Sequence, residues 1–310
     1  MARHLLKISD FTKIECEKVI DKAIDIKRKP DNYGTSLKGE TLLMLFEKPS
    51  LRTRISFETG MQQLGGHAIF YSIKDSPLGQ KENIHDTAKV ASRFVNIIAA
   101  RVFKRQDIQD LAKYSDVPVI NMLDDYAHPC QMIGDFLTVK EKKGKLYDLK
   151  MAYYGDAHNN VTYDLMRICA LFGLKLDVAC PKGAEYTPEQ EVLEDVEHLA
   201  NSSGAMVNVI HEPVEAAKDA DIIYTDSWMS YGIPKELEEE RKKAFGPFQV
   251  TSQIMKKAKD DAIFMNCLPA MRGYEQTAEV IDGPQSIVFD QAENRLHGQK
   301  AIMLFLRNKF

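Results

Sequence analysis

Short apolar runs alternate repeatedly with amphipathic stretches of helix length along this chain, and this alternation restricts the folds that it can adopt. The apolar runs show almost no polar alternation, which is typical of strands buried on both faces of a parallel sheet. Strand–helix–strand repetition predicts a doubly wound α/β architecture. The predicted strands cover residues 42–46, 68–72, 96–100, 117–121, 151–154, 175–179, 207–210, 222–225 and 263–266.

The chain of 310 residues is long enough for two such α/β domains. A charge-rich segment broken by Gly144, residues 140–150, follows a long predicted helix and precedes a new strand. We therefore predict that two α/β halves meet there, and that a last helix covers residues 291–306 and opens at 292–295. Ligands of open α/β sheets bind at the carboxyl ends of the strands, so the segments that follow the strands are the candidates for a site.

Composition narrows the class of protein further. With 44% hydrophobic and 28% charged residues, the chain has the composition of a globular protein. No apolar run approaches the ~20 residues of a membrane span, and the N-terminus lacks a signal-peptide core, so we expect a cytoplasmic protein with no membrane partner. The five cysteines form no CxxC pair, which disfavours both a disulfide framework and a structural zinc site. A net charge of −4 gives no reason to expect nucleic acid as a partner.

The segment after the first predicted strand reads Ser50-Leu51-Arg52-Thr53 and leads directly into a helix predicted over residues 54–64, which should end at Gly65-Gly66. Unpaired amides at a helix N-terminus attract anions, and an arginine fork suits phosphate. The alternative is that Ser50 or Thr53 only caps the helix and that the arginines are solvated. Because no Gly-Lys-Ser/Thr sequence is present, a nucleoside triphosphate is disfavoured.

Charged and polar residues also follow the third and fourth predicted strands. Arg101 ends an apolar run, where a charge seldom lacks a partner, either a ligand or a salt bridge at the sheet margin. His128 precedes Pro129, which fixes the first turn of a helix, and the positive helix end favours the neutral imidazole. Gln131 lies near the same helix face, whereas we expect Cys130 to pack.

The second half offers candidates for binding an amino acid. Asn159 and Asn160 follow the fifth predicted strand and could hold a carboxylate or an α-amino group, although turn formation is the commoner role of such residues. Asp226 follows a later strand and would favour an ammonium group and repel a dicarboxylate. Cys267 follows the last strand, and a free cysteine is usually buried filler. The single tryptophan, Trp228, is expected to pack.

Together, these segments resemble the aspartate/ornithine carbamoyltransferase family, and its ornithine branch in particular. The resemblance extends almost from end to end, from residue 42 to residue 305, with the segments in the same order. The motifs that carry it are SLRTR at 50–54, HPCQ at 128–131, GD at 155–156 with NN at 159–160, DSWMS at 226–230, CLP at 267–269 and AENR at 292–295.

The resemblance implies a fold and an assembly. Members of the family have two doubly wound parallel-sheet domains that close on the substrates, so we expect the active site in the cleft between them. A carbamoyl phosphate-binding domain would span residues 1–145, an ornithine-binding domain would span 146–290, and the C-terminal helix at 291–310 would pack back on the first domain. The expected assembly is a homotrimer or a multiple of trimers, in which residues 76–82 of a neighbouring subunit approach each phosphate site.

The resemblance also implies residue roles, with no metal and no other cofactor. The expected catalytic residues are Arg101, His128, Cys267 and Arg295. Carbamoyl phosphate would be bound by Ser50, Leu51, Arg52, Thr53, Arg101, His128, Gln131, Cys267, Leu268 and Arg295. L-Ornithine would be bound by Asn160, Asp226, Ser230 and Tyr231.

The implied reaction moves the carbamoyl group of carbamoyl phosphate to the side-chain amine of L-ornithine and gives L-citrulline and phosphate, as part of arginine metabolism. Putrescine or another amine as acceptor is an alternative within the same reaction, and a non-catalytic anion-binding relative is an alternative outside it. Aspartate is disfavoured because residues 226–232 offer no arginine for a second carboxylate. A dinucleotide-dependent oxidoreductase is disfavoured because no G-x-G-x-x-G follows any predicted strand.

Three departures from the family pattern concern the acceptor and the subunit contact. Tyr231 stands where methionine is common, which would reshape the acceptor pocket. Asn266 replaces a histidine and removes a titratable neighbour of Cys267. Pro77, in the segment expected to reach a neighbouring subunit, cannot donate a side-chain hydrogen bond.

Overall fold

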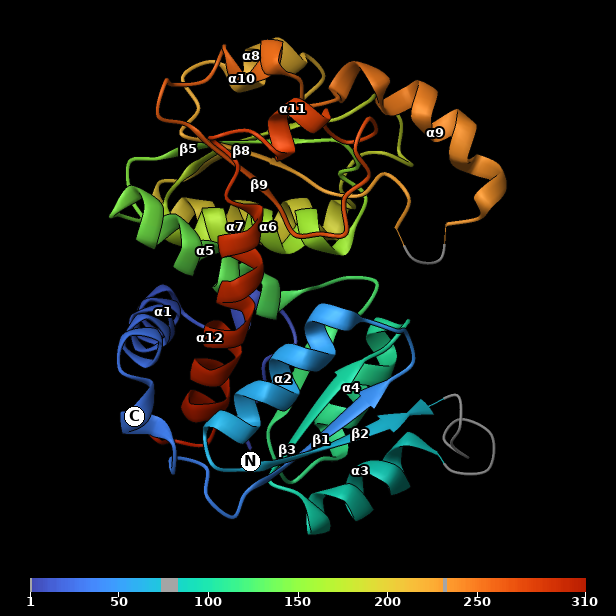
Figure 1. Cartoon of the computed structure of the whole chain (residues 1–310). Helices are drawn as coiled ribbons and strands as arrows, with labels where there is room; N and C mark the ends of the chain where they lie inside the picture. The colour runs from blue at the N-terminus through green and yellow to red at the C-terminus, as the bar shows by residue number, and fades with distance from the viewer. Residues whose placement is uncertain (1, 74–82, 231–232) are drawn as a thin grey trace. The chain divides into compact units, whose positions relative to one another are not determined.

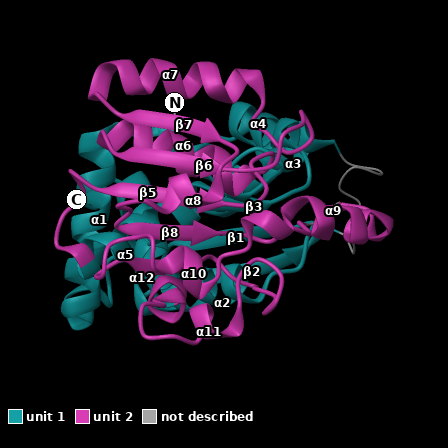
Figure 2. Cartoon of the chain, turned by 90° about the horizontal axis from the view of Figure 1, so that it is seen from above, with its two compact units in different colours: residues 1–142, 293–310 teal, residues 143–292 magenta. Residues whose placement is uncertain are grey.

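The computed structural model describes residues 2–73, 83–230 and 233–310, which form two compact units (Figures 1 and 2). Unit 1 comprises Met1–Lys142 and Glu293–Phe310, and unit 2 comprises Lys143–Ala292. The C-terminal segment therefore belongs with the N-terminal part of the chain, although 150 residues of unit 2 separate them in sequence.

Unit 1 is built on a four-stranded parallel sheet with the order β2–β1–β3–β4. The strands are β1 (Thr41–Phe46), β2 (His67–Ser72), β3 (Ile97–Arg101) and β4 (Val119–Leu123). Every residue of β3 is buried, whereas β2 at the edge of the sheet alternates exposed and half-buried residues. The carboxyl ends of β1, β3 and β4 are neighbours, so the loops that follow these strands lie at one edge.

Helices cover both faces of this sheet (Figure 1). They are α1 (Lys13–Arg28), α2 (Leu51–Gln63), α3 (Ile84–Phe94), α4 (Arg105–Tyr114), α5 (Pro129–Lys143) and α12 (Val288–Leu306). Ala88 of α3 and Leu111 of α4 pack with Ile98 of β3 in one buried cluster. On the opposite face α2 lies against α12, where a Cβ on Gly60 would be only 3.2 Å from the side chain of Lys300.

Unit 2 contains a five-stranded parallel sheet with the order β7–β6–β5–β8–β9. Figure 2 shows β7, β6, β5 and β8 in this order. The strands are β5 (Lys150–Tyr154), β6 (Lys175–Ala179), β7 (Met206–Ile210), β8 (Ile222–Thr225) and β9 (Ile263–Asn266). On one face lie α6 (Asn160–Phe172) and α7 (Gln190–Ser203), and on the other lie α8 (Pro213–Ala217), α10 (Ser252–Met255) and α11 (Ala278–Ile281) (Figure 1). The remaining helix, α9 (Glu238–Phe245), follows the loop after β8.

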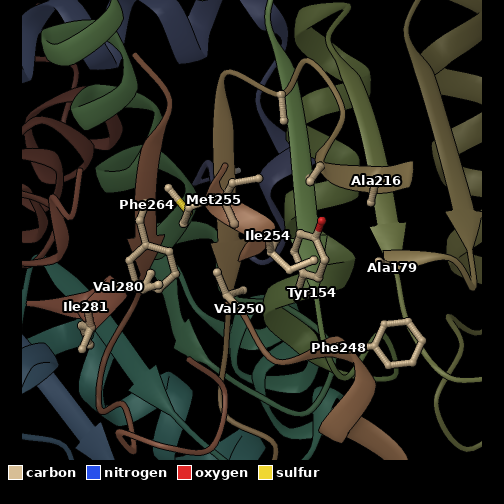
Figure 3. Packing of buried hydrophobic residues seen from close by; sticks show 14 of the residues in the cluster. Tyr154, Ala179, Ala216, Phe248, Val250, Ile254, Met255, Phe264, Val280 and Ile281 are labelled. Atoms are coloured by element: carbon tan, nitrogen blue, oxygen red, sulfur yellow. The ribbon is translucent and has the colours of Figure 1, made fainter. Parts of the chain in front are cut away.

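The face of the unit 2 sheet that α8, α10 and α11 cover has a continuous apolar core (Figure 3). Ile254 and Met255 of α10 and Val280 of α11 pack over Phe264 of β9 and Tyr154 of β5. The strands carry large apolar residues on both faces, as expected for a parallel sheet with helices on each side. This core holds the strand ends at which the loops of the candidate site begin.

The structure confirms the doubly wound parallel architecture and all nine predicted strands. β6, β8 and β9 have the predicted bounds, whereas β4 begins two residues later than predicted. The reason is that the backbone N–H of Val117 is bound by the Ser115 hydroxyl at 3.1 Å, which makes this segment a turn.

The predicted bounds of two helices were wrong at their N-terminal ends. α2 begins at Leu51, directly after its cap Ser50, rather than at residue 54. α12 begins at Val288, so residues 292–295 lie inside this helix and do not open it. The predicted C-terminal stop of α2 is confirmed, because Gly65 adopts a φ of +81° just after the helix, and a Cβ there would lie 2.5 Å from the Gly34 carbonyl oxygen.

Candidate functional site

The loop after β1 directs the N-terminus of α2 toward the carboxyl edge of the unit 1 sheet. Ser50 has an extended backbone and caps the helix, with its Oγ accepting a hydrogen bond from the Thr53 N–H at 3.4 Å. The side chain of Leu51 is 70% exposed, so any role of this residue in binding rests on its backbone N–H. The positive end of a 13-residue helix therefore faces this loop.

His128 lies in a strongly cationic environment. It follows β4, immediately before α5, and is 4% exposed. Burial lowers the pKa of the His128 imidazole far below its usual value, and four nearby cations lower it further. In decreasing order of effect, these cations are Arg295, Arg101, Lys48 and Arg52. The sequence predicted a neutral imidazole because of the helix end, whereas burial and the neighbouring cations are the causes in the structure.

Arg295 connects three helices of unit 1. Its Nη1 donates to Gln131 Oε1 at 2.6 Å, and its Nη2 donates to Thr53 Oγ1 at 3.3 Å. Gln131 in turn donates from Nε2 to the Asp135 carboxylate at 2.7 Å. Arg295 belongs to α12 and is only 3% exposed, so its side chain is not solvated. The hydrogen bonds instead fix its guanidinium beside the N-terminus of α2.

The structure thus brings together the predicted residues of unit 1. Arg101, 5% exposed at the end of β3, is close enough to affect His128, as are Arg52 and Arg295. Thr53 and Gln131 join the same group through Arg295. An excess of buried or half-buried positive charge around a neutral histidine is suited to binding a small anion and to donating hydrogen bonds to it.

Lys48 is a candidate that sequence analysis missed. It lies two residues before Ser50, is 3% exposed, and places its Nζ 4.6 Å from the centroid of the Phe103 ring. Burial, followed by the charge of Arg101, lowers the pKa of Lys48 to about 8. Its position within the Glu47–Ser50 loop was a signal available in the sequence. Its burial was not, because lysine side chains are rarely found inside.

In unit 2, the loop after β5 gives different roles to two adjacent asparagines. Asn159 caps α6 by accepting from the Thr162 N–H at 2.9 Å, and it donates to the Asp156 carbonyl at 2.7 Å. Asn159 therefore forms the turn and caps the helix, which is the commoner of the two roles considered for it. Asn160 is the first residue of α6 and is half-buried, which leaves it as the ligand candidate of this pair.

The loops after β8 and β9 bring an acid and a thiol into contact. Cys267 Sγ donates to Asp226 Oδ1 at 3.1 Å, with Asp226 buried and Cys267 half-buried. Cys267 is therefore not buried filler. Leu268 is half-buried, and its N–H donates to the Asn266 side chain at 2.8 Å.

Asn266 supports the loop that carries Cys267. It is fully buried, and its Nδ2 donates to Gln276 Oε1 at 3.0 Å. Its N–H donates to Gln291 Oε1 at 3.0 Å. Where the family commonly has a histidine, this chain has an asparagine whose side chain and backbone N–H both hold the loop in place.

Ser230 is half-buried, and its carbonyl accepts from the Ile233 N–H at 3.2 Å. Tyr231, the fourth predicted ornithine-binding residue, lies outside the described residues, as does the predicted subunit-contact segment at 76–82 with Pro77.

Two broader searches bear on the kind of site. Over residues 2–73, 83–230 and 233–310, no group of three or more His, Cys, Asp or Glu side chains is arranged to hold a metal ion. Within the same part of the chain, no helix combines the length and the hydropathy needed to cross a membrane.

Sequence models of known families match nearly the whole chain. The carbamoyl-P binding domain of aspartate/ornithine carbamoyltransferase matches residues 3–141, and the Asp/Orn binding domain matches residues 147–306. The chain belongs to the aspartate/ornithine carbamoyltransferase family. The second match includes all of α12, although this helix lies largely in unit 1.

Within the family, the chain is similar to proteins described as ornithine carbamoyltransferases. The chain is 50% identical to the ornithine carbamoyltransferase of Thermococcus kodakarensis, over 97% of this chain and 95% of the relative. It is 48% identical to the anabolic ornithine carbamoyltransferase of Pyrococcus furiosus, over 97% and 95%. The solved structure of the Pyrococcus furiosus enzyme superposes with a TM-score of 0.93 at 47% identity, covering 98% and 96% of the two chains. The Giardia lamblia enzyme gives a TM-score of 0.91 at 43% identity, covering 99% of each chain.

Proposed function

We propose that this chain is an enzyme that transfers the carbamoyl group of carbamoyl phosphate to the side-chain amine of L-ornithine, producing L-citrulline and phosphate. The observation that carries the donor half is the set of cations around the neutral His128. The acceptor half is supported by the buried carboxylate of Asp226 beside Cys267, and by the names of the similar proteins.

In this proposal, unit 1 binds carbamoyl phosphate. The phosphate oxygens would accept hydrogen bonds from the first turn of α2 and from arginine side chains. His128 and Gln131 would hold the carbamoyl group, with Arg295 kept beside them by its bonds to Gln131 and Thr53. The residues that we assign to phosphate are Ser50, Leu51, Arg52, Thr53 and Arg101.

Unit 2 would bind the amino acid. Asp226 is an anion suited to the side-chain ammonium group, which it would orient and strip of water. Asn160, Ser230 and Tyr231 would bind the α-amino acid head group. Cys267 and Leu268 would approach the reacting carbon from the loop after β9.

The chemistry needs two charges to be stabilised. The side-chain ammonium first gives up one proton to solvent. The neutral amine then attacks the carbamoyl carbon, a C–N bond forms, and a tetrahedral adduct with an oxyanion results. The adduct collapses by breaking the C–O bond to phosphate, and the leaving phosphate takes the proton that the amine loses. Fixed cations and neutral donors stabilise both the oxyanion and the leaving phosphate. His128, as a neutral imidazole, can donate a hydrogen bond to the oxyanion.

A panel assay tests the proposal. The purified protein is incubated with carbamoyl phosphate and, in separate reactions, with L-ornithine, putrescine, L-lysine, L-aspartate or N-acetyl-L-ornithine, and the ureido product is measured. We expect L-ornithine to give by far the highest kcat/KM. Preference for another amine would overturn the assignment of the acceptor, and no product with any amine would overturn the assignment as an enzyme.

We also propose that the chain assembles as a homotrimer or a multiple of trimers. The support is a set of exposed apolar residues on unit 1, namely Ile69 and Tyr71 on the edge strand β2 and Val90 and Phe94 on α3. An edge strand with exposed apolar side chains is suited to burial against another subunit. Light scattering coupled to size-exclusion chromatography should give three times the mass of 35.2 kDa or a multiple of it. A monomer would contradict the proposal.

We place the enzyme in the cytoplasm, within arginine metabolism. The five cysteines all lie in the described residues, and none of them forms a disulfide bond, which suits a reducing compartment. The similar protein of Pyrococcus furiosus is described as anabolic, which favours the biosynthetic direction. Growth of an arginine-requiring strain that lacks its own ornithine carbamoyltransferase, restored by this chain, would test the pathway.

A further inference from the structure

Two loops of unit 2 carry the residues that we assign to the acceptor, and both are attached to one side chain of α9. The first loop follows β5 and leads from Asp156 to Asn160, and the second follows β8 and leads from Asp226 to Ser230. Arg241 contacts both of them. It donates from Nη2 to the Asp156 carboxylate and from Nε to the Trp228 carbonyl at 2.7 Å.

This contact is buried. Arg241 is 8% exposed, and Asp156 is 2% exposed. Burial raises the pKa of the Asp156 carboxyl, and the nearby Arg241 charge offsets part of that increase. The other oxygen of Asp156, Oδ1, accepts from the His158 N–H at 2.9 Å, so the carboxylate also shapes the turn that leads to Asn160.

Glu275 holds the second loop from another side. Its Oε1 accepts from the Trp228 N–H at 3.3 Å, and its Oε2 accepts from the Met271 N–H at 2.9 Å. The backbone N–H and C=O of Trp228 are therefore each bound by a charged side chain, one from α9 and one from the segment after β9. Asp226 lies only two residues before this doubly held position.

The Trp228 ring completes the arrangement. It stacks on Phe245 of α9, with ring centroids 5.7 Å apart and planes 27° apart. It also closely approaches the backbone of the first loop. A Cβ on Gly155 would lie 3.0 Å from Trp228 Nε1, and Gly155 has a φ of +118°, so only glycine suits this position.

We propose that Arg241 is a positioning residue of the acceptor site, which fixes the loop after β5 and the loop after β8 in one mutual register so that Asn160 and Asp226 bind the same amino acid. The proposal rests on the proposed function and extends it to a residue outside the loops themselves. Arg241 does not touch the substrate in this scheme. It acts through Asp156 and Trp228.

The geometry requires arginine rather than any cation. A guanidinium presents donors in a rigid planar fork, so Nε and Nη2 can serve two acceptors on different loops at once. A lysine ammonium could keep the charge beside Asp156, but its single nitrogen on a flexible stem does not reproduce the fork. Arg241→Lys therefore tests whether the acceptor site needs the two loops held at a fixed spacing, or only a positive charge beside Asp156.

The chain offers a matched control. Arg272 makes a similar two-point contact, with Nε and Nη2 donating to Asp282 at 2.8 and 2.6 Å, but this pair is about half exposed. Arg272→Lys makes the same chemical change without altering a link between the acceptor loops. It should leave both Michaelis constants unchanged.

The test compares Arg241→Lys, Arg272→Lys and the parent in steady-state citrulline assays with each substrate varied in turn. We expect Arg241→Lys to raise the KM for L-ornithine about tenfold or more, as for the loss of a hydrogen bond to a charged group, with the KM for carbamoyl phosphate within about twofold of the parent. A purely structural role would lower the active fraction and reduce kcat without changing either KM.

Trp228 is the only tryptophan, so its fluorescence reports directly on the held loop. We expect a red-shifted emission for Arg241→Lys and an unchanged emission for Arg272→Lys. Asp156→Asn, which weakens the same contact from the other partner, should also raise the KM for L-ornithine selectively, and it replaces Arg241→Lys if that variant does not fold.

An unchanged KM for L-ornithine in the folded Arg241→Lys or Asp156→Asn variant would overturn the positioning role, and so would an equal rise in both Michaelis constants. In either case the activity of the parent would leave the proposed function standing. A parent that forms no citrulline would overturn the function and, with it, the positioning role.

Discussion

The candidate sites of the two units use charge in opposite ways. In unit 1, cations converge from separate loops and from α12 on the neutral His128, and most of the predicted residues belong to this group. In unit 2, most of the motif residues support the loops. Asn159 caps α6, Trp228 packs, and Asn266 holds the segment that carries Cys267. In unit 2, therefore, a residue that belongs to a family motif need not contact the ligand, and only a few of the motif side chains are available to bind the acceptor.

The largest expected effect tests the cationic group of unit 1. Arg101→Ala should lower kcat by about 10²–10³-fold, as for removal of one preorganised donor at a developing oxyanion. Lys140→Ala is the control, because Lys140 pairs with Asp21 at the surface of the same unit. Equal activities of the two variants in the citrulline assay would remove Arg101 from the site.

The next effect tests the acid of unit 2. Asp226→Asn keeps the shape of the side chain but removes its charge, so the KM for L-ornithine should rise by about 10–100-fold, equivalent to ~1.5–3 kcal/mol for a hydrogen bond to a charged group. The exposed Asp260→Asn serves as the control. If Asp226→Asn instead raised only the KM for carbamoyl phosphate, the division of the substrates between the two units would be wrong.

A smaller effect concerns pH and Lys48. With a pKa of about 8, this ammonium loses its charge as the pH rises above that value. Between about pH 8 and 10.5 the unfolded chain keeps a proton on Lys48 that the folded chain has lost, so the contribution of Lys48 to the free energy of unfolding rises with pH in this window. The affinity for an anion depends on pH in the opposite way, because an anion binds more tightly to the charged ammonium of Lys48, which is lost as the pH rises.

We therefore expect the affinity for inorganic phosphate, measured by calorimetry, to fall as the pH rises through about 8. In Lys48→Met the affinity should be several-fold lower at pH 7, and the decrease through this range should be reduced. A Lys48→Met variant with the same pH profile as the parent would show that Lys48 does not contribute to the anion site.

The smallest effect separates the adjacent asparagines of unit 2. Asn159→Ala removes a helix cap and should lower the free energy of unfolding by about 1 kcal/mol, measured by urea titration. Asn160→Ala should leave stability nearly unchanged and raise the KM for L-ornithine. The reverse result would exchange the roles of ligand and cap that the hydrogen bonds assign.

Local patterns predicted well whatever depends on neighbours in sequence. The strands were predictable because continuous apolar runs suit parallel strands with both faces covered, and the stop of α2 was predictable because Gly65 suits a left-handed backbone. The start of α12 was not, since its first turn in Val288–Asp290 shows no cap or proline signal. Lys48 and Arg241 escaped notice for another reason. Charged residues are assumed to be solvated unless a fold buries them.

The order of residues was enough to predict the architecture, the family and most of the candidate residues, because periodicity and short motifs are local properties of the chain. Tertiary structure decided which candidates meet. It brought Arg295 beside residues more than 160 positions away, as its bonds to Gln131 and Thr53 show, and it joined two loops through Arg241. Burial and charge interactions depend on distances in space, which the order of residues along a chain does not specify.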